Sequence, residues 1–289
     1  MTDIGFIGVG DMGGPISRHL VTAGHDVTAY DLDEDALADV AETGAIRGET
    51  ARDAAAGAEI IFLCLPGPAE VEAVVEDIEN TLETGALLVD LSTSRPALTD
   101  ALADRLSKGG VEVLGAPISG GTHCAAAGTL TVMVGGDRAA FEAAEPVFAN
   151  FAADRYHVGD RPGHGHATKL LNNYLSYTAL VATSEAVILG TVAGLDPSQL
   201  VDIFSVSTGR NSATEHKFPN LILEGKETGF PLKLTEKDTR LLTEFARDQD
   251  VPLLLGHITH HLIGYARRHE GDTADMTDVY EFLRSVMAG

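Results

Sequence analysis

The sequence predicts a doubly wound α/β domain followed by an all-α domain, with a long helix joining the two. Short apolar runs alternate with helical patterns through the first half, which is typical of a parallel sheet covered by helices on both faces. After about residue 160 only helical patterns remain, and a Gly/Pro-rich stretch at 159–165 separates the two regions. A chain of 289 residues has room for two such domains.

The apolar runs of the first half are bounded by turn residues and predict the strands of the sheet. Predicted strands lie at 4–9, 26–30, 59–65, 86–91, 111–116 and 129–134, with helices at 15–23, 34–43 and 69–80. In the second half, helices are predicted at 166–193, 198–206, 235–248, 252–269 and 275–287. We therefore expect an α/β domain at 1–161 and an all-α domain at 162–289.

The chain is strongly acidic, with 43 Asp and Glu residues against 20 Lys and Arg and a formal net charge of −23. Such a surface repels phosphate backbones and anionic membranes, so neither nucleic-acid nor membrane binding is expected. The spread of acid along the chain fits a protein of a very salty cytoplasm or an ordinary acidic cytosolic protein. The longest uncharged stretch, 113–136, is broken by Pro117 and many glycines and does not predict a membrane helix.

Cysteine usage and the first residues both predict a cytoplasmic location. Cys64 and Cys124 are too few for a disulfide framework and lie among apolar or small residues, as unreactive thiols do. The chain runs directly into a strand pattern, without the basic and apolar segments of a signal peptide.

A glycine motif follows the first predicted strand and opens the first helix: Gly8, Val9, Gly10, Asp11, Met12, Gly13. In this context the first glycine permits a tight turn, the second lets a pyrophosphate approach the backbone, and the third allows close helix–sheet packing. The helix N-terminus adds unpaired N–H groups and a partial positive charge. The motif predicts a Rossmann-type dinucleotide site.

Asp31 follows the second strand, about 20 positions after the first glycine, where a ribose-binding carboxylate is expected. Its charge would repel a 2′-phosphate, and Leu32 supplies no positive charge to compensate, so NAD is expected rather than NADP. The alternative is a loop aspartate that caps the next helix. Asp33 and Glu34 are expected to be the cap and a first-turn residue.

A second candidate loop, Ser119-Gly120-Gly121, lies at a strand end, where open α/β sheets bind their ligands. Its hydroxyl and two N–H groups suit a carboxylate, although an ordinary glycine-rich turn has the same sequence. The segments Leu65-Pro66 and 90–96 also follow strands, and hydroxyls of the latter could face a nicotinamide. For Ser92 and Ser94 we favour N-cap roles.

Four polar residues share one face of the long helix, because His166, Lys169, Asn173 and Ser176 are spaced by three, four and three residues. A lysine near a helix start is usually solvated. This helix is too apolar to be solvated all round, and Asn173 lies one turn beyond Lys169. We therefore expect Lys169 to be functional.

Together these segments resemble the β-hydroxyacid dehydrogenase family, which includes 3-hydroxyisobutyrate dehydrogenase and 2-hydroxy-3-oxopropionate reductase. The resemblance covers essentially the whole chain, and six motifs occur in the right order. They are GFIGVGDMGGPI, CLP at 64–66, DLSTSRP at 90–96, APISGGTHCAAAGTLTVMVGG at 116–136, GHGHATKLLNN at 163–173 and FPLKLTEKD at 230–238.

The resemblance implies roles for individual residues. Lys169 matches the family's catalytic lysine, and Asn173 matches the asparagine that orients the substrate. Cofactor contacts are expected from the glycine motif with Asp31, and from Leu65, Pro66, Thr93 and Lys237. Substrate contacts are expected from Ser119, Gly120, Gly121, His123, Phe230 and Asp238. His123 and Cys124 stand where many relatives carry other residues, which leaves the substrate's far end open.

The implied reaction moves a hydride between NAD and a small β-hydroxy acid of the 3-hydroxyisobutyrate or glycerate type. Lys169 would take the hydroxyl proton in oxidation and return it in reduction, which requires its pKa to fall from about 10.4. The resemblance also implies a homodimer or homotetramer built by the all-α domain. Serine, threonate and sulfonated analogues remain open as substrates.

Other functions remain as alternatives. An imine-reducing relative generally lacks the lysine, and phosphogluconate-decarboxylating relatives are longer, although Arg210 and Asn211 could contact a polar substrate tail. A catalytically silent NAD-binding module is the alternative from another class. His257, His260 and His261 have helical spacing, but no full ligand set accompanies them, so no metal is expected.

Overall fold

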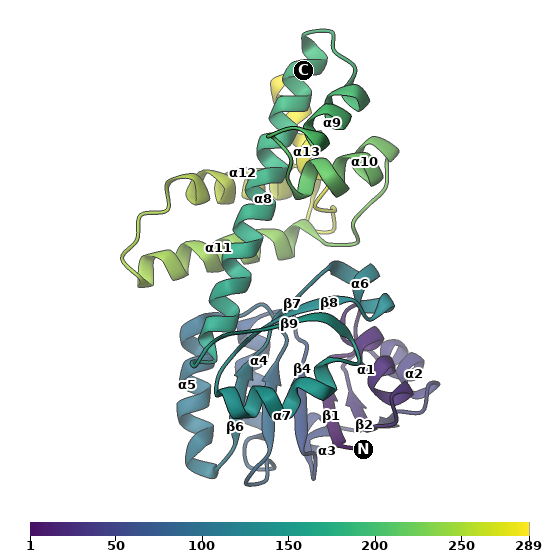
Figure 1. Cartoon of the computed structure of the whole chain (residues 1–289), viewed down its shortest axis with the longest axis vertical. Coiled ribbons are helices and arrows are strands. Elements are labelled where there is room, and N and C mark those ends of the chain that lie inside the picture. Colours follow the sequence, from purple (N-terminus) through teal and green to yellow (C-terminus); the bar gives the residue numbers. More distant parts are fainter. Residues whose placement is uncertain (289) are drawn as a thin grey trace. The chain divides into compact units, whose positions relative to one another are not determined.

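The computed structural model describes residues 1–288, which form two compact units, Met1–Lys169 and the part from Leu170 onward. The first is an α/β sheet with covering helices and the second is helical, as the sequence predicts (Figure 1). The predicted boundary at 161/162 lies just before helix α8 (Gly163–Val192). The first turns of α8 belong to the first unit because a Cβ on Gly165 would lie only 2.0 Å from the Gly115 carbonyl oxygen.

The sheet of the first unit has the order β3-β2-β1-β4-β5-β6-β8-β7, and β9 pairs with β8. Neighbours are parallel except at β8, which is antiparallel to both β6 and β7. The strands are β1 (Asp3–Ile7), β2 (Asp26–Tyr30), β3 (Ile46–Arg47), β4 (Ile60–Leu63), β5 (Leu87–Asp90), β6 (Glu112–Gly115), β7 (Ile118–Ser119), β8 (Leu130–Gly135) and β9 (Ala152–Gly159).

Both faces of the sheet are buried, because alternate residues of the central strands enter two separate cores. In β4, for example, Phe62 packs on one face and Ile61 on the other. Helices α1 (Gly13–Thr22), α2 (Glu34–Ala41) and α7 (Arg138–Phe148) cover the first face; α3 (Ala51–Ala55), α4 (Pro68–Ile78) and α5 (Pro96–Leu106) cover the second. A 3-10 turn, η1 (Ser107–Gly109), follows α5, and α6 (Gly121–Ala127) follows β7.

Strand β9 was not expected from the sequence. Its segment alternates poorly, with Asp154, Arg155 and His157 among its residues, and only Ala152 is fully buried. It forms a strand because β8 provides a parallel partner for the residues from Ala152 to Gly159. A tertiary contact, not a local pattern, stabilises this edge.

The second unit contains α9 (Pro197–Val206), the π-turn η2 (Ala213–Lys217), α10 (Phe218–Asn220), the 3-10 turn η3 (Ile222–Glu224), α11 (Leu232–Asp248), α12 (Leu254–Glu270) and α13 (Asp278–Met287). Together with the later turns of α8 they surround a core that includes Leu180, Phe218 and Ile263. Within residues 170–288 the only β pairing is an isolated bridge between Pro231 and Asp275. The expected absence of strands in this unit therefore agrees with the structure of these residues.

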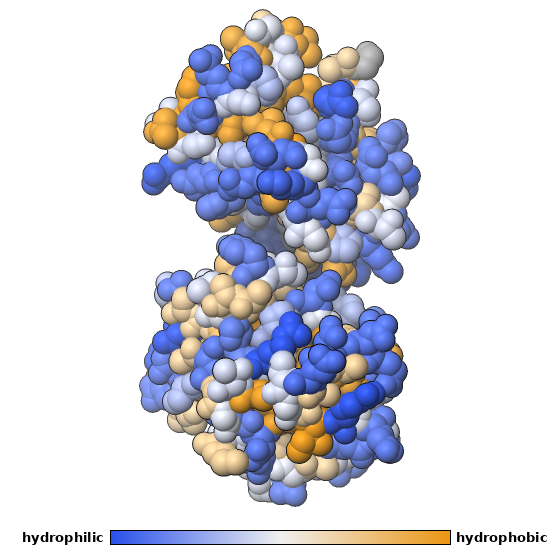
Figure 2. Space-filling model, turned by 90° about the vertical axis from the view of Figure 1, so that its right-hand side faces the viewer, coloured by the Kyte–Doolittle hydropathy of each residue, from blue (hydrophilic) through white to orange (hydrophobic). Residues whose placement is uncertain are grey.

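Helix α8 is long and apolar enough to cross a membrane, judged by length and composition alone, and the central helix of a folded domain has the same properties. Its exposed apolar side chains include Leu175 and Leu189, and apolar patches lie among polar residues on the surface (Figure 2).

Candidate functional site

The glycine motif forms the turn from β1 into α1 with the geometry of a dinucleotide cradle. Gly8 has a φ of +96°, and a Cβ there would lie 2.3 Å from the Cys64 carbonyl oxygen. A Cβ on Gly13 would lie 1.9 Å from the Gly8 carbonyl oxygen, so the third glycine permits close packing. Beside Gly10, in contrast, a Cβ would meet no atom within 4 Å, which leaves the approach to the backbone open. This arrangement fits a pyrophosphate at the helix N-terminus.

Asp31 follows β2 and is bonded to the glycine loop. Its Oδ2 accepts a hydrogen bond from the Val9 N–H at 2.6 Å, and its Oδ1 accepts one from the Asp33 N–H at 2.9 Å. Asp33 is the N-cap of α2 and Glu34 lies in the first turn, as expected. Asp31 therefore does not cap α2 itself, and its carboxylate is held beside the loop that would bind the cofactor.

Positive charge near the end of β2 is already paired. Leu32 is 88% exposed, and the Arg47 side chain on neighbouring β3 forms an ion pair with Glu34. The Asp31 carboxylate would therefore repel a 2′-phosphate, and Arg47 is already paired with Glu34.

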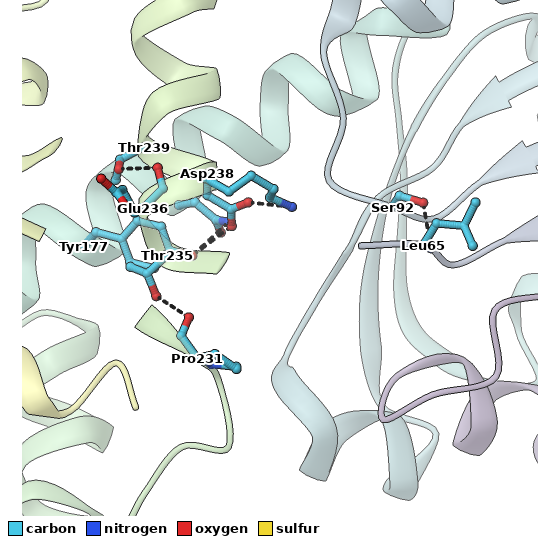
Figure 3. A network of polar contacts seen from close by, with 10 residues as sticks. Leu65, Ser92, Tyr177, Pro231, Thr235, Glu236, Asp238 and Thr239 are labelled. Atoms are coloured by element: carbon cyan, nitrogen blue, oxygen red, sulfur yellow. Dashed lines mark hydrogen bonds and ion pairs between the residues drawn. The ribbon is translucent and has the colours of Figure 1, made fainter. Parts of the chain in front are cut away.

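The expected N-cap roles of Ser92 and Ser94 are wrong. The N-cap of α5 is Arg95, and no side chain caps that helix. The Ser92 hydroxyl instead accepts a hydrogen bond from the Leu65 N–H at 2.9 Å (Figure 3), while Ser94 is fully buried. Ser92 thus joins the loops after β4 and β5, a long-range contact that the local pattern does not reveal.

A buried contact between a carboxylate and an imidazole ring connects these loops to the start of α8. The Asp90 Oδ1 accepts from the Ser92 N–H at 2.9 Å, and its Oδ2 lies 3.4 Å from His166 Nε2. The His166 side chain is 0% exposed and that of Asp90 2%. His166 lies one turn before Lys169, which is also buried. The contact therefore joins the loop after β5 to the helical turn that precedes Lys169.

The predicted carboxylate loop connects β7 to α6. Ser119 ends β7 and is half-buried, and Gly120 has a φ of +134°, which favours glycine. His123 is exposed and lies 3.5 Å from the Cys124 sulfur, while Cys124 packs against the core of the first unit. Cys64, in the loop after β4, has the properties expected of an unreactive thiol, since burial and then the charges of Asp90 and Asp31 raise its pKa to about 12.

In the second unit, Asn173 belongs to a buried polar cluster between α8 and α11. The Asn173 Nδ2 donates to Asp238 Oδ2 at 2.8 Å, and the Tyr177 hydroxyl donates to the same oxygen at 2.9 Å. Figure 3 shows Tyr177 and Asp238 facing each other from the two helices. Burial, followed by the charge and hydrogen bond of Asp238, raises the pKa of Tyr177 well above its ordinary value, so it stays a donor.

Two other predicted residues lie close to this cluster in sequence. Lys237 Nζ lies 3.1 Å from Asp238 Oδ1, with the lysine side chain 16% exposed. Phe230 packs against the helical core, and its N–H donates to Asp275 Oδ2 at 3.0 Å. Asp238 therefore contacts Asn173, Tyr177 and Lys237, and within the second unit it acts as the residue that positions Asn173.

Tyr177 and Asp90 were missed by the sequence interpretation. Tyr177 lies one turn after Asn173, a spacing that could have revealed it. Arg210, which was considered for a substrate tail, is exposed. Asn211 instead forms a hydrogen bond within its own loop, where its Oδ1 accepts from the Ala213 N–H at 2.8 Å.

Among residues 1–288, no group of three His, Cys, Asp or Glu side chains could hold a metal ion.

Comparison with known proteins supports both units. The family described as the NAD binding domain of 6-phosphogluconate dehydrogenase matches residues 3–159. The family described as NAD-binding of NADP-dependent 3-hydroxyisobutyrate dehydrogenase matches residues 163–283.

Individual relatives match over nearly the full chain. The chain is 39% identical to 2-(hydroxymethyl)glutarate dehydrogenase of Eubacterium barkeri over 86% of this chain and 84% of the relative. It is 34% identical to 3-hydroxyisobutyrate dehydrogenase of Pseudomonas aeruginosa over 98% and 99%. A solved structure of Mycobacterium tuberculosis 3-hydroxyisobutyrate dehydrogenase with L-serine has a TM-score of 0.91 at 29% identity, over 98% of this chain and 99% of that one. The chain therefore belongs to the β-hydroxyacid dehydrogenase family and is an NAD-dependent oxidoreductase that acts on CH–OH groups.

Proposed function

We propose that this dehydrogenase oxidises a small β-hydroxy acid with Lys169 as general acid and base. The observation that carries the proposal is the arrangement along α8, where buried Lys169 precedes Asn173 by one turn and Asn173 is held by Asp238 and Tyr177. Fixed side chains on one helix face can hold a hydroxyl group and exchange its proton.

The hydroxy acids in the names of three similar dehydrogenases share one chemical unit. In 3-hydroxyisobutyrate, L-serine and 2-(hydroxymethyl)glutarate, a hydroxymethyl group is attached to a carbon that carries a carboxylate. They differ only in the second substituent, which is methyl, ammonium or carboxyethyl. We propose the shared unit, a 3-hydroxypropionate substituted at carbon 2, as the substrate class of this chain.

Each functional group of the shared 3-hydroxypropionate skeleton has a counterpart among the predicted site residues. The Ser119 hydroxyl and the N–H groups of Gly120 and Gly121 would bind the carboxylate. Asn173 would orient the substrate, and Lys169 would remove the proton of the substrate hydroxyl. Bound NAD supplies the hydride acceptor, and the glycine cradle with Asp31 would hold it.

The test measures turnover of four hydroxy acids through the absorbance of the NADH that forms. The panel contains 3-hydroxyisobutyrate, L-serine, glycerate and 2-(hydroxymethyl)glutarate. Lys169→Ala should lower kcat by about 100-fold or more while NAD still binds, because the proton acceptor is lost and the cradle is not. Lys233→Ala, a change at an exposed lysine of α11, is the matched control. A kcat near wild type in Lys169→Ala would refute the assignment of the base.

We also propose that the protein acts as a cytoplasmic homodimer or homotetramer assembled through the helical unit. Most of the protein's exposed large apolar side chains lie in the helical unit, as expected for a surface that a second copy covers. They include Leu175, Leu189, Val206, Leu254 and Ile258. Light scattering on the purified protein tests this, and a monomer mass at micromolar concentration would contradict it.

A further inference from the structure

The second unit holds a half-buried cation that the proposed reaction does not use. Lys217 ends the π-turn η2, and its Nζ donates to Ser176 Oγ at 2.9 Å and to Ser212 Oγ at 3.1 Å. In the part of the chain that the structure describes, no carboxylate lies within ion-pair distance of this amine. Lys226 and Lys237 of the same unit each lie beside a carboxylate, whereas the printed partners of Lys217 are two serine hydroxyl groups.

A hydrogen bond connects the segment that precedes Lys217 to α8. Asn211 donates to Thr183 Oγ1 at 3.3 Å, and its Oδ1 accepts from the Ala213 N–H. Ser205 Oγ donates to the Thr214 carbonyl oxygen at 3.0 Å, which ties the same turn to α9. π-turns interrupt regular helix geometry and often occur at functional sites. The ammonium group is therefore held over one face of α8 and is not a mobile surface charge.

That face of α8 is the one that carries the proposed catalytic residues. Ser176 lies three residues after Asn173 and seven after Lys169, so the three positions share a face. Seven residues of helix are about 10 Å long. A hydroxyl group and a carboxylate separated by four carbon atoms, with a hydrogen bond at each end, span a similar length.

The donors of the cluster suit an anion. Lys217 has three N–H groups and donates two of them to the serines, which leaves the third N–H and both serine O–H groups for a ligand. Burial lowers the pKa of Lys217 to about 8, so the amine is still mostly charged at neutral pH. A bound anion would favour the charged form further.

We propose that Lys217, Ser176 and Ser212 bind a second carboxylate at the far end of the substrate. This inference rests on the proposed function and narrows it to dicarboxylic β-hydroxy acids. The carboxyethyl member of the panel above is of this type, whereas the methyl member lacks the second anion.

The test compares Lys217→Met with Lys226→Met, which changes the net charge equally at an exposed lysine of the same unit. For the dicarboxylic member of the panel, Lys217→Met should raise KM and lower kcat/KM by about 10- to 100-fold, as expected when a charged hydrogen-bond partner is lost. For the methyl member, kcat/KM should change less than about threefold. The double variant Ser176→Ala, Ser212→Ala keeps the charge and should show a smaller loss in the same direction. Equal losses for both acids, or none for the dicarboxylic one, would overturn the proposal.

Binding separates this inference from the proposed reaction. Calorimetry on the NAD-bound enzyme should detect glutarate but not valerate, and Lys217→Met should abolish the glutarate signal. If no hydroxy acid is turned over while glutarate binding still depends on Lys217, the proposed function fails and the anion site stands. If hydroxy acids are turned over but Lys217→Met changes neither glutarate binding nor selectivity, only the anion site fails.

Discussion

The Asn173 amide nitrogen donates to Asp238 Oδ2 at 2.8 Å, a contact between helices α8 and α11 that is completely buried. Asp238 receives a second hydrogen bond from the Tyr177 hydroxyl at the same oxygen. A residue expected to line the substrate pocket thus orients another predicted site residue, and this relationship can be tested by substitution.

Replacing Asp238 by Ala should lower the free energy of unfolding by about 2–4 kcal/mol, because two buried donors lose their charged acceptor. Tyr177→Phe, which removes one hydrogen bond, should cost only about 1 kcal/mol. Chemical denaturation measures both, with Asp248→Ala at the exposed end of α11 as control. Equal stability of Asp238→Ala and the wild type would show that the cluster does not hold the two helices.

Asp90→Ala should also destabilise the protein, by about 1–3 kcal/mol, since it removes the carboxylate beside the buried His166 ring and leaves the Ser92 N–H without its acceptor. Asp90→Asn keeps an acceptor and should cost less. Thermal unfolding distinguishes the two variants. An Asp90→Ala variant with the wild-type Tm would argue against a structural pair at the start of α8.

The double variant Asp31→Ser, Leu32→Arg should shift cofactor preference toward NADP by about 10- to 100-fold, because it removes the repelling carboxylate and adds a cation for the 2′-phosphate. The ratio of kcat/KM for the two cofactors measures this shift. Leu32→Ser is the control for the loss of the exposed leucine. An unchanged ratio would mean that other residues select the cofactor.

Asp275 should make stability depend on pH. Its burial acts to raise the pKa, but hydrogen bonds from Thr277 and Thr228 outweigh burial and hold the pKa below its ordinary value. The stability that it contributes is therefore present above about pH 3.9 and is lost as the pH falls through the lower folded-state pKa. The stability difference between wild type and Asp275→Asn, measured by denaturation, should be large at pH 6 and shrink toward pH 3. A difference independent of pH would exclude this linkage.

Salt should stabilise the chain, because a net charge of −23 makes the folded state repel itself and salt screens that repulsion. We expect the Tm to rise between about 0.1 M and about 2 M KCl, where the screening length falls several-fold. Differential scanning calorimetry gives the measurement. A Tm that falls or stays constant would contradict an adaptation to high salt.

Local backbone requirements made much of this protein predictable. The spacing of Gly8, Gly10 and Gly13 after an apolar run specifies a turn and a close helix–sheet contact within a few residues, so the cradle could be predicted from sequence. Strand β2 and the N-cap Asp33 were predicted for the same reason, because an apolar alternation and a cap are local patterns. The common face of Lys169 and Asn173 follows from helical periodicity alone.

Contacts between distant segments were decided only by the tertiary structure. The bond from Leu65 N–H to Ser92, the pairing of β9 with β8, and the contact of Lys217 with Ser176 each join residues that are far apart in sequence. None leaves a periodic signal, because a serine, an edge strand or a lysine has the same local pattern with or without its partner. Periodicity and motif spacing predict most of the helices and strands and the glycine turn between β1 and α1. Packing alone determines which polar side chains meet.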